Sequence, residues 1–428
     1  MMTIGPVTSH FPSDGLQQLP PQHRWALADE TLLRAIARGV PMVRGAAGSR
    51  LRRLLGFTNR VGLIWPTVVL VSLVELIKTL RIQHSAPSPI LGRGDAPTPP
   101  YFFVGFGAGA EEELYERYRN QRAGVVARIS QIDINSLASW HRVAPWHAIR
   151  EWARALKTAR QAVDALPSDL VSRRLDFLTW IGSRAARFAY MTAWFRALRD
   201  SSVGVVQEVA FVANDTAAFA AVEAGLPACY LQHGMLSRSL LFAEFTRVEA
   251  LSAVDADYLA RRIPRSLVTH GAYAKESILP ATMSNSLLVA SIYGDPSYIE
   301  RIIPFLRWAA DRKLNVIVRP HPREDGSFWT RTDSSRLVSV QPSNATFQEH
   351  LAKVRPRLVV SWFSTALADA LEMGIIPVSV CGDHDPNVAD MVYPLFQHCL
   401  RWPHDIDLIE RLLVDDASYA VVLSRLHS

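Results

Sequence analysis

The feature that most constrains the fold is an alternation of short apolar strands with helical segments, which begins at Tyr101. The pattern YFFVG at residues 101–105 is followed by a glycine-rich loop and a helix that starts near Glu111. Such alternation is typical of βαβ units, whose strands form parallel sheets covered by helices. Further strands are predicted at Val203–Ala213, Ala228–Leu231, Ser266–Thr269, Ser286–Ile292, Leu314–Arg319, Arg357–Val360 and Ile376–Val380.

The length of the chain predicts more than one domain. Its 428 residues exceed what a single hydrophobic core usually supports. A hydrophobic fraction of 49% and a charged fraction of 20% exclude a disordered chain. We therefore expect two α/β domains with parallel sheets. The expected organisation is an N-terminal basic and apolar helical region with a proline-rich linker at 1–95, a first Rossmann-like domain at 96–270, a second at 271–405 and a C-terminal helix at 406–428.

Several common functional motifs are absent from the sequence. The three cysteines form no CxxC pair, so neither a disulfide framework nor a thiolate zinc site is expected, and a reducing compartment fits. There is no P-loop, HExxH or GxSxG motif. The loop from Gly105 to Gly109 has the spacing GxGxG, which differs from the dinucleotide fingerprint GxGxxG. Three D-x-D triplets are short enough to arise by chance, so we expect no metal site.

The positive charge of the chain is concentrated near its N-terminus. The formal net charge is +6, yet the stretch from Thr31 to Val74 contains seven Arg and no Asp or Glu. Within this region the segment Val61–Ile77 is strongly apolar and is flanked by Arg60 and Arg81. Three alternatives remain open for the apolar segment: a buried core helix, a helix at a membrane interface, or a transmembrane helix.

Basic residues next to apolar ones are suited to a membrane with anionic headgroups. No zinc motif or RNP pattern accompanies them, so a nucleic-acid partner is not expected. We expect residues 31–81 to contact an anionic membrane surface. The protein would then be cytoplasmic and peripheral, at the inner face of the cytoplasmic membrane.

Polar residues follow two predicted strands of the first domain. Asp215 lies two residues after the apolar run that ends at Ala213, and a helix capped by Gly225 follows it. Gln232 and His233 follow the next short strand, and Gly234 permits a tight turn there. Ligands of open α/β sheets bind beyond the carboxyl ends of the strands. Asp215 is thus either a helix cap or a functional carboxylate, and His233 is a candidate for proton chemistry.

A second group of polar residues follows strands of the second domain. Arg319 and His321 lie in the sequence Arg-Pro-His-Pro, where two prolines stiffen the turn, and a cationic pair of this kind suits a phosphate. Ser364 and Thr365 precede a predicted helix, whose N-terminal N–H groups attract anions. Asp369 lies one turn into this helix and is a candidate for ribose hydroxyls. Together these residues predict a site for a nucleotide monophosphate.

The order of these motifs resembles that of a known family. Gln-His-Gly, then Arg-Pro-His-Pro, then Ser-x-x-Ser-Thr ahead of Gly-x-x-Pro resembles bacterial surface-polysaccharide glycosyltransferases of the GT-B type, over about residues 101–405. The His-Pro motif and Ser/Thr pair resemble those of the CMP-sugar users, which include sialyltransferases, polysialyltransferases and Kdo transferases. The retaining β-Kdo transferases are the most similar. Teichoic-acid glycerophosphotransferases, which use CDP-glycerol, share a similar His-Gly and His-Pro pair.

The resemblance implies two Rossmann-like domains that face a cleft, with the donor nucleotide on the second. His321 would contact the donor phosphate, and Ser364 and Thr365 would complete the anion site. Asp215 would be the nucleophile of a retaining reaction, and His233 the base of an inverting one. The residues expected near the acceptor side of the cleft are Gly107, Glu111, Glu112 and Gln232.

The resemblance also implies a CMP-sugar donor and a membrane-linked glycan acceptor. A CMP-sugar releases a nucleoside monophosphate, so His and Arg with helix-terminal N–H groups could replace a metal. One feature departs from the sialyltransferases, because Glu111-Glu112-Glu113 is not followed by the glycine that completes their acidic motif. A UDP-sugar transferase, an epimerase-like protein, a CDP-glycerol phosphotransferase and a non-catalytic glycan-binding scaffold remain as alternatives.

Overall fold

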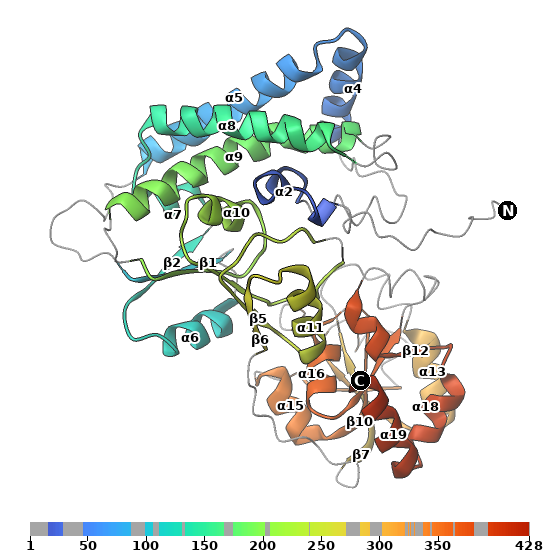
Figure 1. Cartoon of the computed structure of the whole chain (residues 1–428). Helices are drawn as coiled ribbons and strands as arrows, with labels where there is room; N and C mark the ends of the chain where they lie inside the picture. Colours follow the sequence, from blue (N-terminus) through green and yellow to red (C-terminus); the bar gives the residue numbers. More distant parts are fainter. Residues whose placement is uncertain are drawn as a thin grey trace. The chain divides into compact units, whose positions relative to one another are not determined.

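The structure of the chain is a computed structural model in which two compact units can be distinguished (Figure 1). The first contains Met1–His233, Ser237–Glu249 and Leu259–Thr269, and the second contains the remaining residues. Each unit has a six-stranded sheet with parallel strands, which confirms the predicted fold class. The structure describes residues 16–28, 46–86, 99–105, 111–130, 133–166, 174–201, 206–238, 240–270, 283–291, 302–321, 337–342, 345–362, 364–380 and 393–427, with Glu324, Gly326 and Trp329.

The sheet of the first unit has the strand order β2-β1-β3-β4-β5-β6. Its outer strand β2 and its inner strand β5 were not predicted from the sequence, since each is short and carries charged residues. The bounds are β1 Tyr101–Gly105, β2 Val126–Ser130, β3 Glu208–Phe211, β4 Ala228–Leu231, β5 Arg247–Ala250 and β6 Leu267–His270.

Both faces of this sheet are covered, as expected for parallel strands. Because successive side chains alternate between faces, Phe103 and its neighbours form one apolar layer. They pack against Leu114 and Tyr118 of α6 (Glu112–Asn120). On the opposite face, Phe211 makes an edge-to-face contact with Phe195 of α9 (Arg174–Ser201), with ring centroids 6.0 Å apart.

The N-terminal helices pack in the same unit as this sheet. Helices α5 and α8 both lie on α9, and α2 and α4 also contact it (Figure 1). Gly182 of α9 allows close approach, because a Cβ there would lie 3.0 Å from Cγ1 of Val71 in α5. The described residues of the predicted N-terminal region (1–95) and most of those of the predicted first Rossmann-like domain (96–270) thus lie in one unit. The helix bounds are α2 Pro21–Leu27, α4 Ala46–Arg60, α5 Ile64–Ser85, α7 Ile134–Ala138, α8 Pro145–Asp164 and α10 Thr216–Glu223; α11 Ala253–Arg262 contributes to both units.

The apolar segment Val61–Ile77 is neither fully buried nor fully exposed. Most of it lies in α5, where Val68, Ser72 and Leu76 form a buried stripe. The hydroxyl of Ser72 accepts a hydrogen bond from Nε1 of Trp152 in α8 at 2.8 Å. The other face of α5 is exposed to solvent. No helix within the described ranges has the length and apolar character needed to cross a membrane.

The second unit has the strand order β12-β11-β10-β7-β8-β9. Its core includes Leu288, Ile317 and Val359 from three adjacent strands, packed against helices α15 and α16. The predicted C-terminal helix is divided into α18 and α19, and Tyr419 of α19 accepts a hydrogen bond from the N–H of Ile376. The bounds are β7 Ser284–Ala290, β8 Asn315–Arg319, β9 Ser339–Val340, β10 Pro356–Ser361, β11 Ile376–Val380, β12 Leu400–Trp402, α13 Ile303–Asp311, α15 Phe347–Val354, α16 Ala366–Glu372, α18 Ile406–Leu412 and α19 Asp416–His427.

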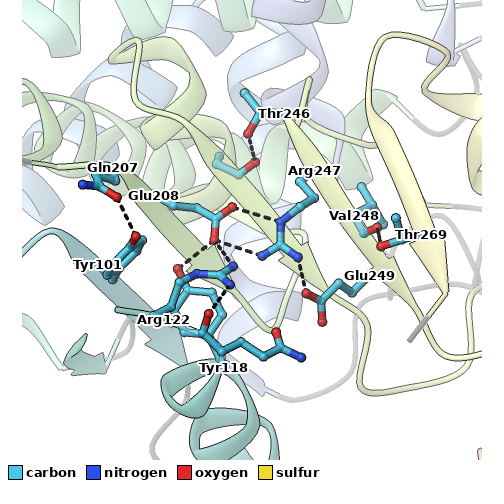
Figure 2. Close-up of polar contacts among 12 residues, drawn as sticks. Tyr101, Tyr118, Arg122, Gln207, Glu208, Thr246, Arg247, Val248, Glu249 and Thr269 are labelled. Carbon is cyan, nitrogen blue, oxygen red and sulfur yellow. Dashed lines mark hydrogen bonds and ion pairs between the residues drawn. The ribbon is translucent and has the colours of Figure 1, made fainter. Parts of the chain in front are cut away.

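A largely buried ionic network joins the amino ends of β3 and β5 to the C-terminal end of α6 (Figure 2). Glu208, the first residue of β3, accepts hydrogen bonds from Tyr118 at 2.8 Å, from Arg122 at 2.6 Å and from Arg247 at 3.0 Å. Arg247 begins β5 and also contacts Glu249. Although burial alone would raise the pKa of Glu208, the hydrogen bonds from Arg247 and Arg122 hold it below its usual range.

We predict that Glu208→Gln lowers the free energy of unfolding by about 3 kcal/mol at neutral pH, because it leaves two largely buried arginines without their shared carboxylate. The folded-state pKa of Glu208 is depressed, so its contribution is complete above the unfolded-state pKa and is lost as the pH falls through the folded-state pKa. The difference between wild type and variant should therefore shrink below a pH of about 4.3. Urea denaturation over a pH series measures both effects.

The matched control is Glu116→Gln, which removes an exposed ion pair with Arg119 in the same unit. This control should cost less than about 1 kcal/mol. Equal losses of stability in the two variants would show that the network contributes no more than a surface ion pair.

Candidate functional site

Three strands of the first sheet bring the candidate catalytic residues to one edge. Strands β1, β3 and β4 are adjacent and parallel, so their carboxyl ends lie side by side. Glu111 follows β1, Asp215 follows β3, and Gln232 and His233 follow β4. The sequence therefore identified residues of one sheet edge, although they are up to 122 positions apart, from 111 to 233.

Asp215 caps helix α10 and also faces a cation. Its Oδ1 accepts a hydrogen bond from the N–H of Ala217 at 2.9 Å, and its Oδ2 lies 4.0 Å from Nη2 of Arg187 in α9. Burial raises the pKa of Asp215, while the charge of Arg187 and the N–H of Ala217 act in the opposite direction. The side chain is still 28% exposed. Asp215 thus combines the capping role with the accessibility and raised basicity that a base or nucleophile requires.

His233 is held in one tautomer by the strand next to it. Its Nδ1 lies 2.6 Å from the carbonyl oxygen of Val212, directly after β3. A carbonyl oxygen can only accept a hydrogen bond, so Nδ1 carries the proton. In the neutral ring, Nε2 then has the lone pair and is the atom that can accept a proton. Because His233 is exposed, this nitrogen belongs to an accessible side chain.

A buried amide next to Asp215 anchors the loop that follows His233. Asn214 donates to the carbonyl oxygen of Leu241 at 2.6 Å and accepts from the N–H of Ala243 at 3.1 Å. Gln232 is fully buried, and its backbone N–H donates to the carbonyl oxygen of Glu249. Asn214 was not predicted as a functional residue. The feature of the sequence that could have identified it is its position, as a polar residue between an apolar strand and a helix cap. We assign it a positioning role.

The remaining candidates of the first unit differ in their placement. Glu111 is buried, and its carboxylate lies so close to Cα of Gly105 that a side chain there would collide with it. It therefore belongs to the edge at the end of β1. Glu112 instead forms an exposed ion pair with Arg128 of β2 at 2.5 Å. Gly107 lies outside the described residues.

In the second unit, Arg319 makes contacts within the protein. Its two terminal nitrogens donate to the carbonyl oxygens of Ala345 at 2.5 Å and Thr346 at 2.8 Å. Arg319 is 6% exposed, and burial lowers its pKa, which the charge of Asp369 partly opposes. These contacts hold the start of α15 against the end of β8, a structural role that sequence analysis did not anticipate for this residue.

His321 lies in a tight turn after β8. Its backbone N–H donates to the carboxylate of Glu324 at 3.1 Å, and the N–H of Glu324 donates back to the carbonyl oxygen of His321. These reciprocal bonds and Pro320 restrain the backbone of His321, whose side chain is partly exposed. The bond to the carboxylate gives Glu324 a structural role next to His321.

The predicted hydroxyl pair lies at the end of β10. The hydroxyl of Ser364 accepts a hydrogen bond from the N–H of Ala366 at 3.2 Å, and Thr365 begins α16 without a side-chain cap bond. Both residues are partly exposed. Asp369 accepts a hydrogen bond from Nε2 of Gln348 in α15 at 2.7 Å, so this carboxylate is partly engaged between two helices.

A serine that sequence analysis missed lies between these two loops. Ser291 directly follows β7, the strand between β8 and β10. Its N–H donates to the carbonyl oxygen of Arg319 at 3.0 Å. Its hydroxyl is buried and has no hydrogen-bond partner among the residues that the structure describes. A buried hydroxyl of this kind is normally satisfied, so Ser291 joins the candidate donor-binding residues.

Within the described ranges, no group of three or more His, Cys, Asp or Glu residues is arranged to hold an ion.

No protein-family model matches the chain, and no curated protein matches its sequence. Solved structures that resemble it include the glycosyltransferase SnogD from Streptomyces nogalater (14% identity, TM-score 0.44, 76% of this chain and 93% of that chain). MurG from Acinetobacter baumannii is similar at 11% identity and TM-score 0.41, over 77% and 95% of the chains. The UDP-GlcNAc 2-epimerase from Methanocaldococcus jannaschii, in complex with UDP-GlcNAc and UDP, has 8% identity and TM-score 0.40, over 77% and 99%. At such identities and scores these similarities carry no conclusion about activity.

Proposed function

We propose that the protein is a glycosyltransferase that transfers Kdo or a related nonulosonic acid from a CMP-sugar to a glycan of the capsule or lipopolysaccharide type. The observation that carries the proposal is the edge formed by β3 and β4. There a partly exposed carboxylate, Asp215, and an imidazole of fixed tautomer, His233, follow adjacent strands. A base and a carboxylate at one edge are the groups that sugar transfer requires.

The two residues support either stereochemical course. In a retaining reaction, the carboxylate of Asp215 attacks the anomeric carbon as the bond to the phosphate oxygen breaks and CMP leaves; the acceptor oxygen then displaces the carboxylate and gives its proton to Nε2 of His233. In an inverting reaction, Nε2 of His233 takes the proton of the acceptor hydroxyl as that oxygen attacks the anomeric carbon, and the bond from this carbon to the phosphate oxygen breaks so that CMP leaves. In both courses the transition state resembles an oxocarbenium ion, which a nearby carboxylate stabilises.

The second unit would hold the donor nucleotide. The partly exposed His321 would donate to the phosphate, with Ser364, Thr365 and Ser291 as hydroxyl partners. Asp369 would contact the ribose. Arg319 would act indirectly, since its guanidinium holds the start of α15. A departing nucleoside monophosphate develops less charge than a diphosphate, so the proposed reaction needs no metal.

The alternatives differ in the nucleotide that they use. A UDP-sugar transferase would bind UDP, a CDP-glycerol phosphotransferase would bind CDP-glycerol, and a non-catalytic scaffold would bind glycan alone. We further propose that the acceptor is a membrane-linked glycan. The protein would then lie at the inner face of the cytoplasmic membrane, in keeping with the basic and apolar residues 31–81.

We predict that CMP stabilises the protein against thermal unfolding, because a ligand that binds only the folded state adds about 2.7 kcal/mol at a hundred times its dissociation constant. Thermal shift with CMP, UDP and CDP-glycerol measures this directly. His321→Ala should abolish the shift, and the rate of sugar transfer should fall about a hundredfold or more. Arg307→Ala, at an exposed position of the same unit, is the control and should leave the shift unchanged. Stabilisation by UDP but not CMP would refute the proposed donor.

We predict that Asp215→Asn and His233→Ala each lower the rate of sugar transfer by about a hundredfold or more while the CMP-dependent thermal shift is retained. The physical reason is that both residues act on the sugar or the acceptor, whereas the nucleotide is bound by the other unit. Product formation from CMP-Kdo and CMP-sialic acid with a range of acceptors gives the rates. Full activity of both variants would exclude this edge as the catalytic site.

We predict that Arg187→Gln shifts the acidic limb of the pH–rate profile to higher pH. The charge of Arg187 lowers the pKa of Asp215, so its loss raises that pKa, and the carboxylate becomes protonated at a higher pH as the solution is acidified. The rate at alkaline pH should change less than the rate at acidic pH. An unchanged profile would mean that Asp215 does not control the titration.

A further inference from the structure

Helices α4 and α5 carry an exposed apolar surface around the turn that joins them. Seven large apolar side chains contribute to it, each between 41% and 63% exposed; they are Leu54, Phe57, Val61, Leu63, Leu70, Val74 and Ile77. We call this set the α4–α5 apolar surface. Single exposed apolar residues are common on soluble proteins, but seven of them within residues 54–77 of two consecutive helices indicate a binding surface.

Helix periodicity places several of these side chains on one side of each helix. At about 100° per residue, Leu70, Val74 and Ile77 lie on one side of α5, opposite the stripe that packs on α9. Leu54 and Phe57, spaced three residues apart, likewise share a side of α4. The side of α5 that carries Leu70, Val74 and Ile77 is therefore turned away from the core.

The turn itself is a well-defined helix end. Gly62 has φ +73°, the N–H of Leu63 donates to the carbonyl oxygen of Thr58 at 2.7 Å, and the N–H of Gly62 donates to that of Asn59. These are the two bonds of a Schellman motif. The motif fixes the direction in which the chain leaves α4 and so keeps Val61 and Leu63 at the turn.

The charged residues of α4 and α5 themselves are almost all positive. Residues 46–86 contain six Lys and Arg but a single acidic residue, Glu75, which forms an ion pair with Lys78 at 2.7 Å. Arg53 and Arg60 are exposed on α4, and Arg81 is exposed on the same side of α5 as Leu70. An occupant with an apolar interior and an anionic rim complements this arrangement.

We propose that the α4–α5 apolar surface binds a lipid bilayer with anionic headgroups, with both helices lying along the interface and the turn inserted among the acyl chains. The proposal rests on the proposed function in so far as a membrane-linked acceptor requires the enzyme at the bilayer. A helix bound in this way buries its apolar face at the headgroup boundary while its guanidinium groups pair with lipid phosphates. Under this proposal, the segment Val61–Ile77 combines two of the predicted alternatives, because one face of α5 belongs to the core and the other lies at the membrane interface.

The test is co-sedimentation of the full chain with vesicles of phosphatidylcholine mixed with phosphatidylglycerol, compared with phosphatidylcholine alone. The wild type should bind the anionic vesicles, and binding should weaken as salt screens the charges. Arg53→Gln with Arg60→Gln should lower the partition coefficient by about 30-fold, and Phe57→Ser with Leu70→Ser by about tenfold or more. All four side chains are exposed, so these changes should leave thermal stability unchanged.

Matched controls come from the second unit. Val414→Ser with Val421→Ser removes two equally exposed apolar side chains, and Arg307→Gln removes an exposed charge. These controls should bind vesicles as the wild type does. Equal binding of the wild type to neutral and anionic vesicles, or equal binding by all variants, would overturn the proposal. The proposal would also be overturned if the protein bound no vesicles and instead formed a dimer in sedimentation velocity that Phe57→Ser with Leu70→Ser dissociates.

The two proposals fail separately. Vesicle binding is measured without nucleotide, and the CMP-dependent thermal shift is measured without vesicles. If the protein binds CMP but no vesicles, the proposed function stands and the proposed membrane surface is refuted. If it binds vesicles but not CMP, the membrane surface stands and the proposed donor is refuted.

Discussion

Parallel pairing of β3 with its neighbours is the constraint on which the candidate catalytic edge depends. Val104 of β1 pairs with Phe211 of β3, which pairs with Tyr230 of β4, so the three strands end together. Everything that follows these strands must emerge at one edge. The hydrogen bond from His233 to the carbonyl oxygen of Val212 is a direct product of this register. A change of register would remove this hydrogen bond.

The two edges of the first sheet perform different tasks. The amino edge carries the network of Glu208, Arg122 and Arg247, in which buried charges satisfy each other (Figure 2). The carboxyl edge carries Asp215 and His233, whose side chains remain partly or fully exposed. The ionic network and the residues of the proposed chemistry thus lie at opposite ends of the strands, although Asp215 also caps α10. In the second sheet both kinds of residue lie at the carboxyl end of β8, where Arg319 supports α15 and the partly exposed His321 follows two residues later.

Much of the fold could be predicted because apolar strands alternate with helices in the sequence. The strands Tyr101–Gly105, Ala228–Leu231 and Ile376–Val380 were predicted with the bounds that the structure has. Strands β2 and β5 were missed, since VARIS and RVEA include charged residues that only become compatible with a sheet when partners neutralise them. Local sequence cannot reveal such partners, because Arg247 and Glu208 are 39 positions apart.

The sequence by itself determined the two parallel sheets and the polar residues that follow their strands. It also determined the one-sided charge of residues 31–81, because composition and periodicity are local properties. Only the tertiary structure decided which of these side chains are engaged. Arg319 is bound to two backbone carbonyls, Ser291 has a buried hydroxyl beside it, and α5 has one face on α9 and the other in solvent. The physical reason is that burial and hydrogen bonding depend on residues far apart in the chain, which become neighbours only when the sheets and helices pack.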